Sequence, residues 1–133
     1  MKLGIESAVG SVECVVSETM TAQLDGRDIH PVYSTFWACY HCEVAARRAI
    51  EPYFEEGEDA VGSALSLKHL AMAAIGAELM ITAHVSRIES NRITCIVRIT
   101  TKQTGTLLAE GTQEQAVLSQ TRLRTLVDNA LKS

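Results

Sequence analysis

Three side chains of different chemical type stand out in the sequence because each can move a proton or take part in attack on a carbonyl carbon. They are the hydroxyl of Thr35, the carboxylate of Glu43 and the imidazole of His69. Reactions at an activated carbonyl need a nucleophile, a proton acceptor and donors that stabilise the oxyanion. The three groups are remote in sequence, so this chemistry depends on a fold that gathers them in one cleft.

A single long helical pattern carries two of these residues. Between His30-Pro31 and Pro52, apolar side chains recur every three or four positions, which predicts an amphipathic helix of about five turns. The two prolines mark its ends, and Ser34 or Thr35 is expected to cap its first turn. The side chains expected to face the core are Phe36, Trp37, Tyr40, Val44, Ala45, Ala49 and Ile50.

Thr35 and Glu43 cannot meet directly on this helix. Eight residues apart on an ideal helix, their Cα atoms lie about 12 Å from each other and about 80° apart around the axis. Either Thr35 bends back from the incoming loop, or His69 closes the gap, and in a dimer His69 can come from either subunit. The free N–H groups of the first helical turn offer an oxyanion site, because the helix dipole favours negative charge there.

The rest of the chain reads mainly as strands. Residues 9–24 predict a first strand, followed by a turn at residues 25–28. From Ala60 onward the apolar period changes to two, which predicts strands near residues 60–70, 79–86, 93–99 and 106–118. In the first of these, Val61, Ser63, Leu65 and Leu67 are expected on the face opposite Gly62, Ala64, Ser66 and Lys68. A terminal helix over residues 121–131 is expected to turn Leu123, Leu126, Val127 and Leu131 inward.

Strands joined by short turns predict an antiparallel meander that the long helix covers on one face. This α+β arrangement, a curved antiparallel sheet of about five or six strands around one central helix, is the hotdog fold. A length of 133 residues with 47% hydrophobic positions suits a single domain over residues 1–133. Because one helix leaves sheet edges open, we expect a homodimer or a dimer of such dimers.

Composition argues against several classes of partner. The formal charge of −4, without a concentrated basic face, disfavours nucleic acid. No segment resembles a signal peptide or a membrane span, so we expect a soluble cytoplasmic protein. Cys14, Cys39, Cys42 and Cys95 are expected to be free thiols, and one Cys-x-x-Cys pair without a second is weak evidence for metal. We expect neither a metal nor a cofactor.

Several short motifs, in order, resemble the fluoroacetyl-CoA thioesterase-like branch of the hotdog superfamily. They are Ser34-Thr35, Glu43 eight residues later, Val61-Gly62, Lys68-His69-Leu70, and Glu110-Gly111-Thr112 followed by residues 113–118. The likeness covers about residues 30–118. It implies a dimer that hydrolyses acyl-CoA thioesters, with Thr35, Glu43 and His69 as the working groups and Gly62 beside the acyl chain.

The last motif departs from the family pattern. Many members have a histidine and an arginine shortly after the Gly-Thr pair, whereas this chain has the uncharged Gln113 and Gln115, which we assign to substrate binding. Phe36, next to Thr35, is a further candidate for the acyl pocket. The expected substrate is a small or medium acyl thioester of CoA or of a carrier protein, and selectivity for a fluorinated acyl group is not implied.

Each candidate residue also has a simpler structural explanation. Thr35 can be only a helix cap, Glu43 a solvated surface residue and His69 a hydrogen-bonded core or rim residue, while Gly62 can mark a bulge. At the level of function, two alternatives remain beside hydrolysis. One is a non-catalytic hotdog protein that binds an acyl ligand, and the other is a hydratase or dehydratase acting on an enoyl thioester.

Overall fold

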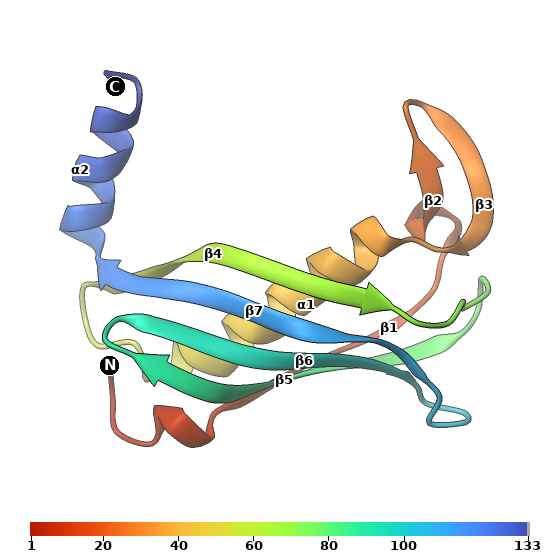
Figure 1. The fold of residues 1–133 in the computed structure, drawn as a ribbon, viewed down its shortest axis with the longest axis horizontal. Helices are drawn as coiled ribbons and strands as arrows, with labels where there is room; N and C mark the ends of the chain where they lie inside the picture. The colour runs from red at the N-terminus through yellow and green to blue at the C-terminus, as the bar shows by residue number, and fades with distance from the viewer. Residues whose placement is uncertain (133) are drawn as a thin grey trace.

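The computed structural model describes residues 1–132. Its central feature is a curved five-stranded antiparallel sheet with strand order β1-β5-β6-β7-β4, which curls around helix α1 (Figure 1). The strands are β1 (Val9–Val15), β4 (Glu58–His69), β5 (Glu78–Glu89), β6 (Arg92–Thr101) and β7 (Leu107–Ser119). The predicted α+β arrangement of an antiparallel meander around one long helix is therefore confirmed.

Helix α1 spans Thr35–Ile50 and begins and ends close to where the sequence predicts. Ser34 is its cap, since the Ser34 hydroxyl accepts a hydrogen bond of 3.1 Å from the backbone N–H of Trp37. At the other end Pro52 lies in the short 3-10 helix η3 (Glu51–Tyr53), where the chain leaves the helix axis. The predicted cap is thus Ser34, and the hydroxyl of Thr35 is left for another partner.

The buried face of α1 differs from the predicted one. It consists mainly of small side chains together with one imidazole, namely Ala38, His41, Cys42, Ala45, Ala46, Ala49 and Ile50. The expectation that Phe36 and Tyr40 point into the core is wrong, because these rings are 73% and 52% exposed. The sheet lies too close to α1 for bulky rings: Gly10 of β1 faces the backbone of Ala45 and Ala49 directly.

The segment predicted as one strand over residues 9–24 is two strands with a break between them. After β1, the 3-10 helix η2 (Glu18–Met20) redirects the chain, and β2 (Thr21–Leu24) pairs with β3 (Arg27–Tyr33) in a separate antiparallel hairpin. Asp25 and Gly26 make the tight turn, both with positive φ. The sequence prediction missed this hairpin and treated His30-Pro31 as a helix entry. Pro31 is tolerated because a two-stranded hairpin leaves many backbone N–H groups unpaired.

A β-bulge at Ser63 changes the faces of strand β4. The register on β7 passes from Gly62 opposite Gln115 to Ala64 opposite Glu114, so Ser63 is the extra residue. Gly62 therefore lies on the inner face with Leu65 and Leu67, whereas simple alternation predicted that it lies opposite them. Beyond the bulge the alternation continues to His69 at the end of the strand.

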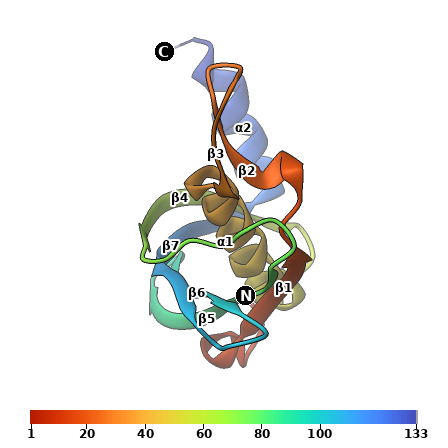
Figure 2. The same ribbon diagram turned by 90° about the vertical axis from the view of Figure 1, so that its right-hand side faces the viewer.

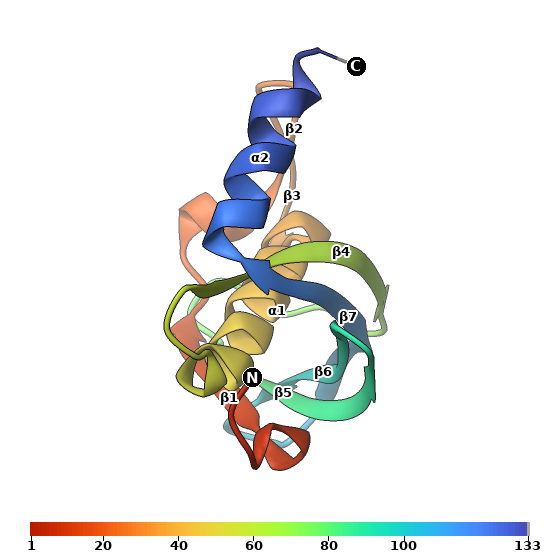
Figure 3. The same ribbon diagram turned by 90° about the vertical axis from the view of Figure 1, so that its left-hand side faces the viewer.

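Helix α2 (Gln120–Ala130) forms where the sequence predicts a terminal helix, but its predicted inward face is wrong. None of its residues is buried, and the helix projects away from the sheet (Figures 1 and 3). The β2–β3 hairpin projects from the opposite end of the molecule in the same direction (Figures 1 and 2). The remaining element, the 3-10 helix η1 (Ile5–Ser7), lies beside the N-terminus. Within residues 1–132, no helix is both long and apolar enough to cross a bilayer.

Candidate active site

Two of the three candidate residues, Thr35 and His69, are in direct contact. Thr35 is the first residue of α1 and His69 is the last residue of β4, and the Thr35 Oγ1 and His69 Nδ1 atoms are 2.9 Å apart. The other ring nitrogen of His69, Nε2, is buried and has no hydrogen-bond partner among the described residues. When Nδ1 accepts the threonine proton, Nε2 carries the ring hydrogen, so the pair can present a proton donor to a bound group.

Glu43 lies in a second cluster, with Gly62 and Gln113. The Gln113 side-chain amide donates to Glu43 Oε2 at 3.2 Å. Gly62 passes so close that a β-carbon at that position would lie 3.0 Å from the same oxygen. The missing side chain thus lets β4 run directly past the carboxylate, and the amide of Gln113 fixes the orientation of that carboxylate.

Both glutamines of the last strand point inward and keep unused hydrogen-bonding atoms. Gln113 and Gln115 are 1% and 3% exposed, and the Gln113 Oε1 and Gln115 Nε2 atoms have no partner within the described residues. A buried amide atom without a partner loses the free energy of at least one hydrogen bond. Such atoms beside a carboxylate are suited to receive the polar groups of a ligand or a water molecule.

The two clusters stay separate within one chain. Glu43 follows Thr35 by eight residues along α1, so their Cα atoms are about 12 Å apart. Glu43 bonds to Gln113, while His69 bonds to Thr35. The two clusters also open into different pockets. One chain thus brings together a hydroxyl with an imidazole, and a carboxylate with an amide, but does not bring the hydroxyl, carboxylate and imidazole to one point.

The pocket at Thr35 and His69 has a volume of about 330 Å³ and is largely apolar. One wall comes from the hairpin, and another from the segment after β4. Its lining residues are Ala22, His30, Val32, Tyr33, Ser34, Thr35, His69, Leu70, Ala71 and Met72. Phe36 is not among them, since its exposed ring packs edge-on against Trp37 instead. A short apolar chain can therefore lie beside the Thr35–His69 pair.

The pocket at Glu43 has a volume of about 460 Å³ and is more polar. Two arginines of the last helical turn, Arg47 and Arg48, line it together with Gly62 and Gln115. Arg47 is already held, because its guanidinium pairs with Glu51 at 2.7 Å and with Asp59 at 2.8 Å. Its charge therefore serves mainly to fix the end of α1 to the start of β4.

A buried pair that sequence reasoning missed supports the His69 side of the site. The Tyr33 hydroxyl and His41 Nδ1 are 2.5 Å apart, and the two rings stack with their centroids at 5.8 Å. The edge of Tyr33 also meets the ring of His69 at 6.3 Å. Burial raises the pKa of Tyr33 and lowers the pKa of His41, so both are neutral. The sequence held one indication that His41 is buried, because it precedes Cys42 and lies three residues after Ala38 and four before Ala45 on α1.

We expect Tyr33→Phe to lower the free energy of unfolding by about 1 to 3 kcal/mol, because it leaves Nδ1 of the buried His41 without its partner. Urea unfolding measures this loss. Tyr40→Phe is the matched control, since it removes the same hydroxyl from a half-exposed ring on α1, next to His41. Equal stability of the two variants would mean that the Tyr33 hydroxyl contributes nothing to the fold.

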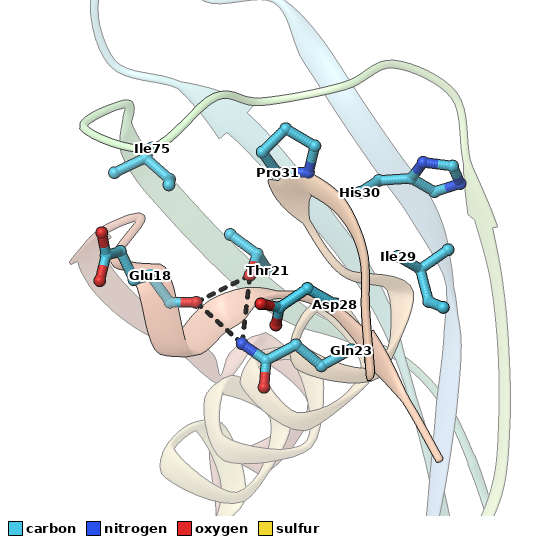
Figure 4. Close-up of a pocket in the computed structure, with 8 residues that line it drawn as sticks. All are labelled: Glu18, Thr21, Gln23, Asp28, Ile29, His30, Pro31 and Ile75. Carbon is cyan, nitrogen blue, oxygen red and sulfur yellow. Dashed lines mark hydrogen bonds between the residues drawn. The ribbon is translucent and has the colours of Figure 1, made fainter. Parts of the chain in front are cut away.

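A somewhat larger pocket lies elsewhere, between the hairpin, η2 and the loop before β5 (Figure 4). It measures about 500 Å³ and carries two carboxylates, Glu18 and Asp28. Its Thr21 and Gln23 side chains both donate to the backbone carbonyl of Glu18, so these donors are already satisfied. None of the residues predicted to act in catalysis lines it, and His30 alone is shared with the pocket at Thr35.

Solved structures with the same architecture define the class of protein. A hypothetical protein from Thermus thermophilus, a thioesterase superfamily member, is 32% identical with a TM-score of 0.90, covering 96% of this chain and 93% of that chain. A hot-dog-like protein from Thermanaerovibrio acidaminovorans is 22% identical with a TM-score of 0.83, covering 93% of this chain and 90% of that one. The chain therefore has the hotdog fold, as predicted.

Sequence comparison narrows the class to one family. The family model of the fluoroacetyl-CoA-specific thioesterase matches residues 16–121, and the chain belongs to this family. A fluoroacetyl-CoA thioesterase from Streptantibioticus cattleyicolor is 30% identical over 82 residues, which cover 62% of this chain. The match spans 52% of that relative, about half of its length. The resemblance inferred from the motifs is thus confirmed.

Proposed function

We propose that the chain hydrolyses small or medium acyl-CoA thioesters at a site assembled between two copies. The observation that carries this proposal is the Thr35–His69 contact of 2.9 Å, with His69 Nε2 buried and unpaired beside an apolar pocket. A hydroxyl and an imidazole so placed can orient a thioester and transfer a proton to its sulfur. Membership of a thioesterase family supports the same reaction.

A second copy supplies the carboxylate in this proposal. Strand β4 is an edge strand of twelve residues, with one side not paired in the sheet. Such an edge favours pairing with the same strand of another copy. Antiparallel pairing centred between Gly62 and His69 brings the Gly62 region of one protomer toward the partner's His69. Glu43, which adjoins Gly62, then approaches the Thr35–His69 pair from across the interface.

In the proposed reaction, Glu43 acts on the carbonyl carbon of the thioester, either as the base that activates water or as the nucleophile. The thioester oxygen becomes an oxyanion, which the first-turn N–H groups of α1 stabilise through the helix dipole. When the carbon–sulfur bond breaks, Nε2 of the partner subunit's His69 donates its proton to the departing thiolate, while the Thr35 hydroxyl holds that imidazole. The water that attacks the acyl carbon, or that cleaves the acyl–Glu43 anhydride when Glu43 is the nucleophile, supplies the proton that replaces it on His69. Water is consumed, and a carboxylic acid and a free thiol are released.

Gln113 and Gln115 take the positions where many family members carry a histidine and an arginine. Gln113 orients Glu43 at 3.2 Å, and the unpaired Gln115 Nε2 offers a donor beside it. Both side-chain amides are uncharged, so they bind a carbonyl group or a water molecule more readily than a phosphate. We therefore infer that these glutamines serve the reacting end of the substrate. The identity of the carrier, CoA or a carrier protein, is tested separately.

The proposal predicts free thiol from acyl-CoA substrates in a DTNB assay. With a panel from acetyl to decanoyl, turnover should be highest at short or medium length, because the pocket of about 330 Å³ limits the acyl group. An acyl-carrier-protein substrate with the same acyl group, tested alongside, distinguishes the two carriers.

A second function, non-catalytic binding of an acyl ligand, is favoured by the two neutral glutamines. It predicts that the same panel binds without releasing thiol, which calorimetry and the DTNB assay separate. Binding without thiol release at any chain length would overturn hydrolysis and support the binding protein. With an enoyl-CoA substrate, loss of the double bond without thiol release would instead indicate a hydratase.

A further inference from the structure

Helix α2 carries an apolar stripe that the other residues of 1–132 leave exposed or only partly covered. Its residues recur at three- and four-residue spacing, and they are Leu123, Leu126 and Val127. Val127 is 60% exposed, and no residue of the helix is buried. A helix of 11 residues is marginal in water unless one face packs against another surface. We therefore expect another surface to cover the apolar stripe of α2.

The β2–β3 hairpin is a second projecting element with exposed apolar side chains. Within residues 1–132, its two strands pair only with each other, apart from one bridge between Val32 and Ala74. Leu24 at its tip is 64% exposed, and Ile29 is partly exposed on the following strand. Isolated two-stranded hairpins are marginally stable. This element also needs a supporting surface.

The two projections flank the open edge of the sheet. In Figure 1, α2 rises at one end of β4 and the hairpin rises at the other, with β4 uppermost between them. Figures 2 and 3 show both projections extending in the same direction from the body. A twofold axis across the middle of β4, roughly along the viewing direction of Figure 1, exchanges the two ends. Each α2 then comes beside the hairpin of the other copy.

We propose that the apolar stripe of α2 docks on the β2–β3 hairpin of a second copy, so that each protomer clamps the other at both ends of β4. This inference rests on the dimer of the proposed function. A groove of about 330 Å³ at the base of α2 lies between the stripe and edge strand β4, since Leu123 and Val127 line it together with Asp59 of β4. The stripe thus opens toward the strand edge where the partner would run.

Charge supports this occupant. Arg122 and Arg124 border the stripe of α2 on its two sides, while Glu18 and Asp28 lie at the hairpin and line its pocket (Figure 4). No ion pair within residues 1–132 involves any of these four side chains. With Asp128 also on α2, the two arginines leave the helix with a net charge of +1. Glu18, Asp25 and Asp28 against Arg27 leave residues 18–33 with a net charge of −2. The two segments therefore attract each other, and the same charges disfavour contact of α2 with another α2.

The clamp would act on the acyl pocket of the partner. Strand β3 carries His30, Val32 and Tyr33, which form one wall of the pocket at Thr35 and His69. A partner helix that holds this hairpin therefore fixes the wall against which the acyl group lies. At protein concentrations well above the dimer dissociation constant, loosening the clamp should raise KM more than it lowers kcat, because no reacting group is removed.

The test compares two substitutions on opposite faces of α2 in the full chain. Val127→Asp places a carboxylate in the apolar stripe, whereas Thr125→Asp adds the same charge on the opposite, exposed face of the helix. Sedimentation equilibrium should show at least a tenfold higher dimer dissociation constant for Val127→Asp, and less than a twofold change for Thr125→Asp. Amide hydrogen exchange over residues 27–33 should become at least tenfold faster in the first variant only.

A charge exchange identifies the contact surface. Reversing both arginines (Arg122→Glu with Arg124→Glu) should weaken the dimer, as should reversing both carboxylates (Glu18→Lys with Asp28→Lys). Combining all four substitutions in one chain should restore the dissociation constant to within threefold of the original. Lys2→Glu, an exposed charge outside both elements, is the control.

Three outcomes would overturn the clamp. One is that the original chain is a monomer. Another is a dimer in which Val127→Asp changes neither the dissociation constant nor the amide hydrogen exchange of residues 27–33. The third is a chain with all four charge reversals whose dimer dissociation constant is no lower than that of the weaker of the two double variants. Hydrolysis is read out separately: a dimer that responds as expected but releases no thiol supports the clamp and overturns the proposed reaction alone.

Discussion

An equimolar mixture of Glu43→Ala and His69→Ala chains is expected to regain the hydrolysis that each variant lacks alone. In either homodimer, both sites miss a group that transfers a proton or attacks, so kcat should fall about 10²- to 10⁴-fold. In a mixed dimer, one site combines the intact His69 of one chain with the intact Glu43 of the other. The second site lacks both groups and stays inactive.

The size of the recovery follows from random exchange of subunits. Half of the dimers are then mixed and each has one complete site of two, so activity should return to about a quarter of the original. DTNB assays after exchange, with mixed dimers quantified by native mass spectrometry, measure this value. The physical basis is that Glu43 and His69 occupy separate clusters within one chain, each with its own hydrogen-bond partner.

A second mixture controls for nonspecific rescue. Thr35 and His69 are bonded within one chain at 2.9 Å, so mixing Thr35→Ala with His69→Ala leaves every site defective and should restore nothing. Recovery in this control would show that the hydroxyl and imidazole do not work as a pair. If mixed dimers form but the Glu43→Ala and His69→Ala mixture stays inactive, then Glu43 does not act across the interface. Unchanged turnover in both single variants would exclude the mechanism altogether.

The elements with strong local signals were predicted well. Pro31 and Pro52 limit the space for α1, and Ser34 caps it, so its ends follow from side-chain chemistry near each end. The meander of β5, β6 and β7 follows from period-two alternation between short turns. The contact between Thr35 and His69, which are 34 residues apart, was predicted only through the family resemblance.

The errors arose where distant parts of the chain decide the outcome. The buried face of α1 is set by how closely β1 approaches it, which favours Ala45 and Ala49 over the larger Phe36 and Tyr40. Amphipathic periodicity alone cannot report that distance. The bulge at Ser63 likewise depends on pairing with β7, and it moves Gly62 to the inner face beside Glu43.

The prediction for α2 failed for a related reason. Its apolar positions were read correctly, but an apolar stripe does not say whether the surface that covers it belongs to the same chain. Gln113 shows a second limit of prediction from sequence, in this case for a polar residue. The family pattern assigned Gln113 to substrate binding, but its bond to Glu43, made by a buried side-chain amide, was not predicted. Only the register of β7 reveals this role.

Gly10→Ala is expected to destabilise the fold strongly, because the added methyl group would collide with the backbone of α1. A β-carbon at Gly10 would lie 2.2 Å from the carbonyl oxygen of Ala45 and 2.4 Å from the backbone nitrogen of Ala49. Both atoms belong to the helix backbone, so no rotamer change relieves the contact. Gly10 is also fixed opposite Ala83 in the β1–β5 ladder. We expect a loss of about 3 kcal/mol or more in the free energy of unfolding.

Two further variants identify backbone contact as the cause. Ser11→Ala, the next residue on the exposed face of β1, should unfold in urea within about 0.5 kcal/mol of the original chain. Ala45→Gly should not rescue Gly10→Ala, because the clashing atoms of residue 45 are not in its side chain. Rescue by Ala45→Gly would assign the clash to side-chain packing. A Gly10→Ala chain within about 1 kcal/mol of the original would mean that α1 can move away from β1 at little cost, and that the small-residue face of the helix is not set by this approach.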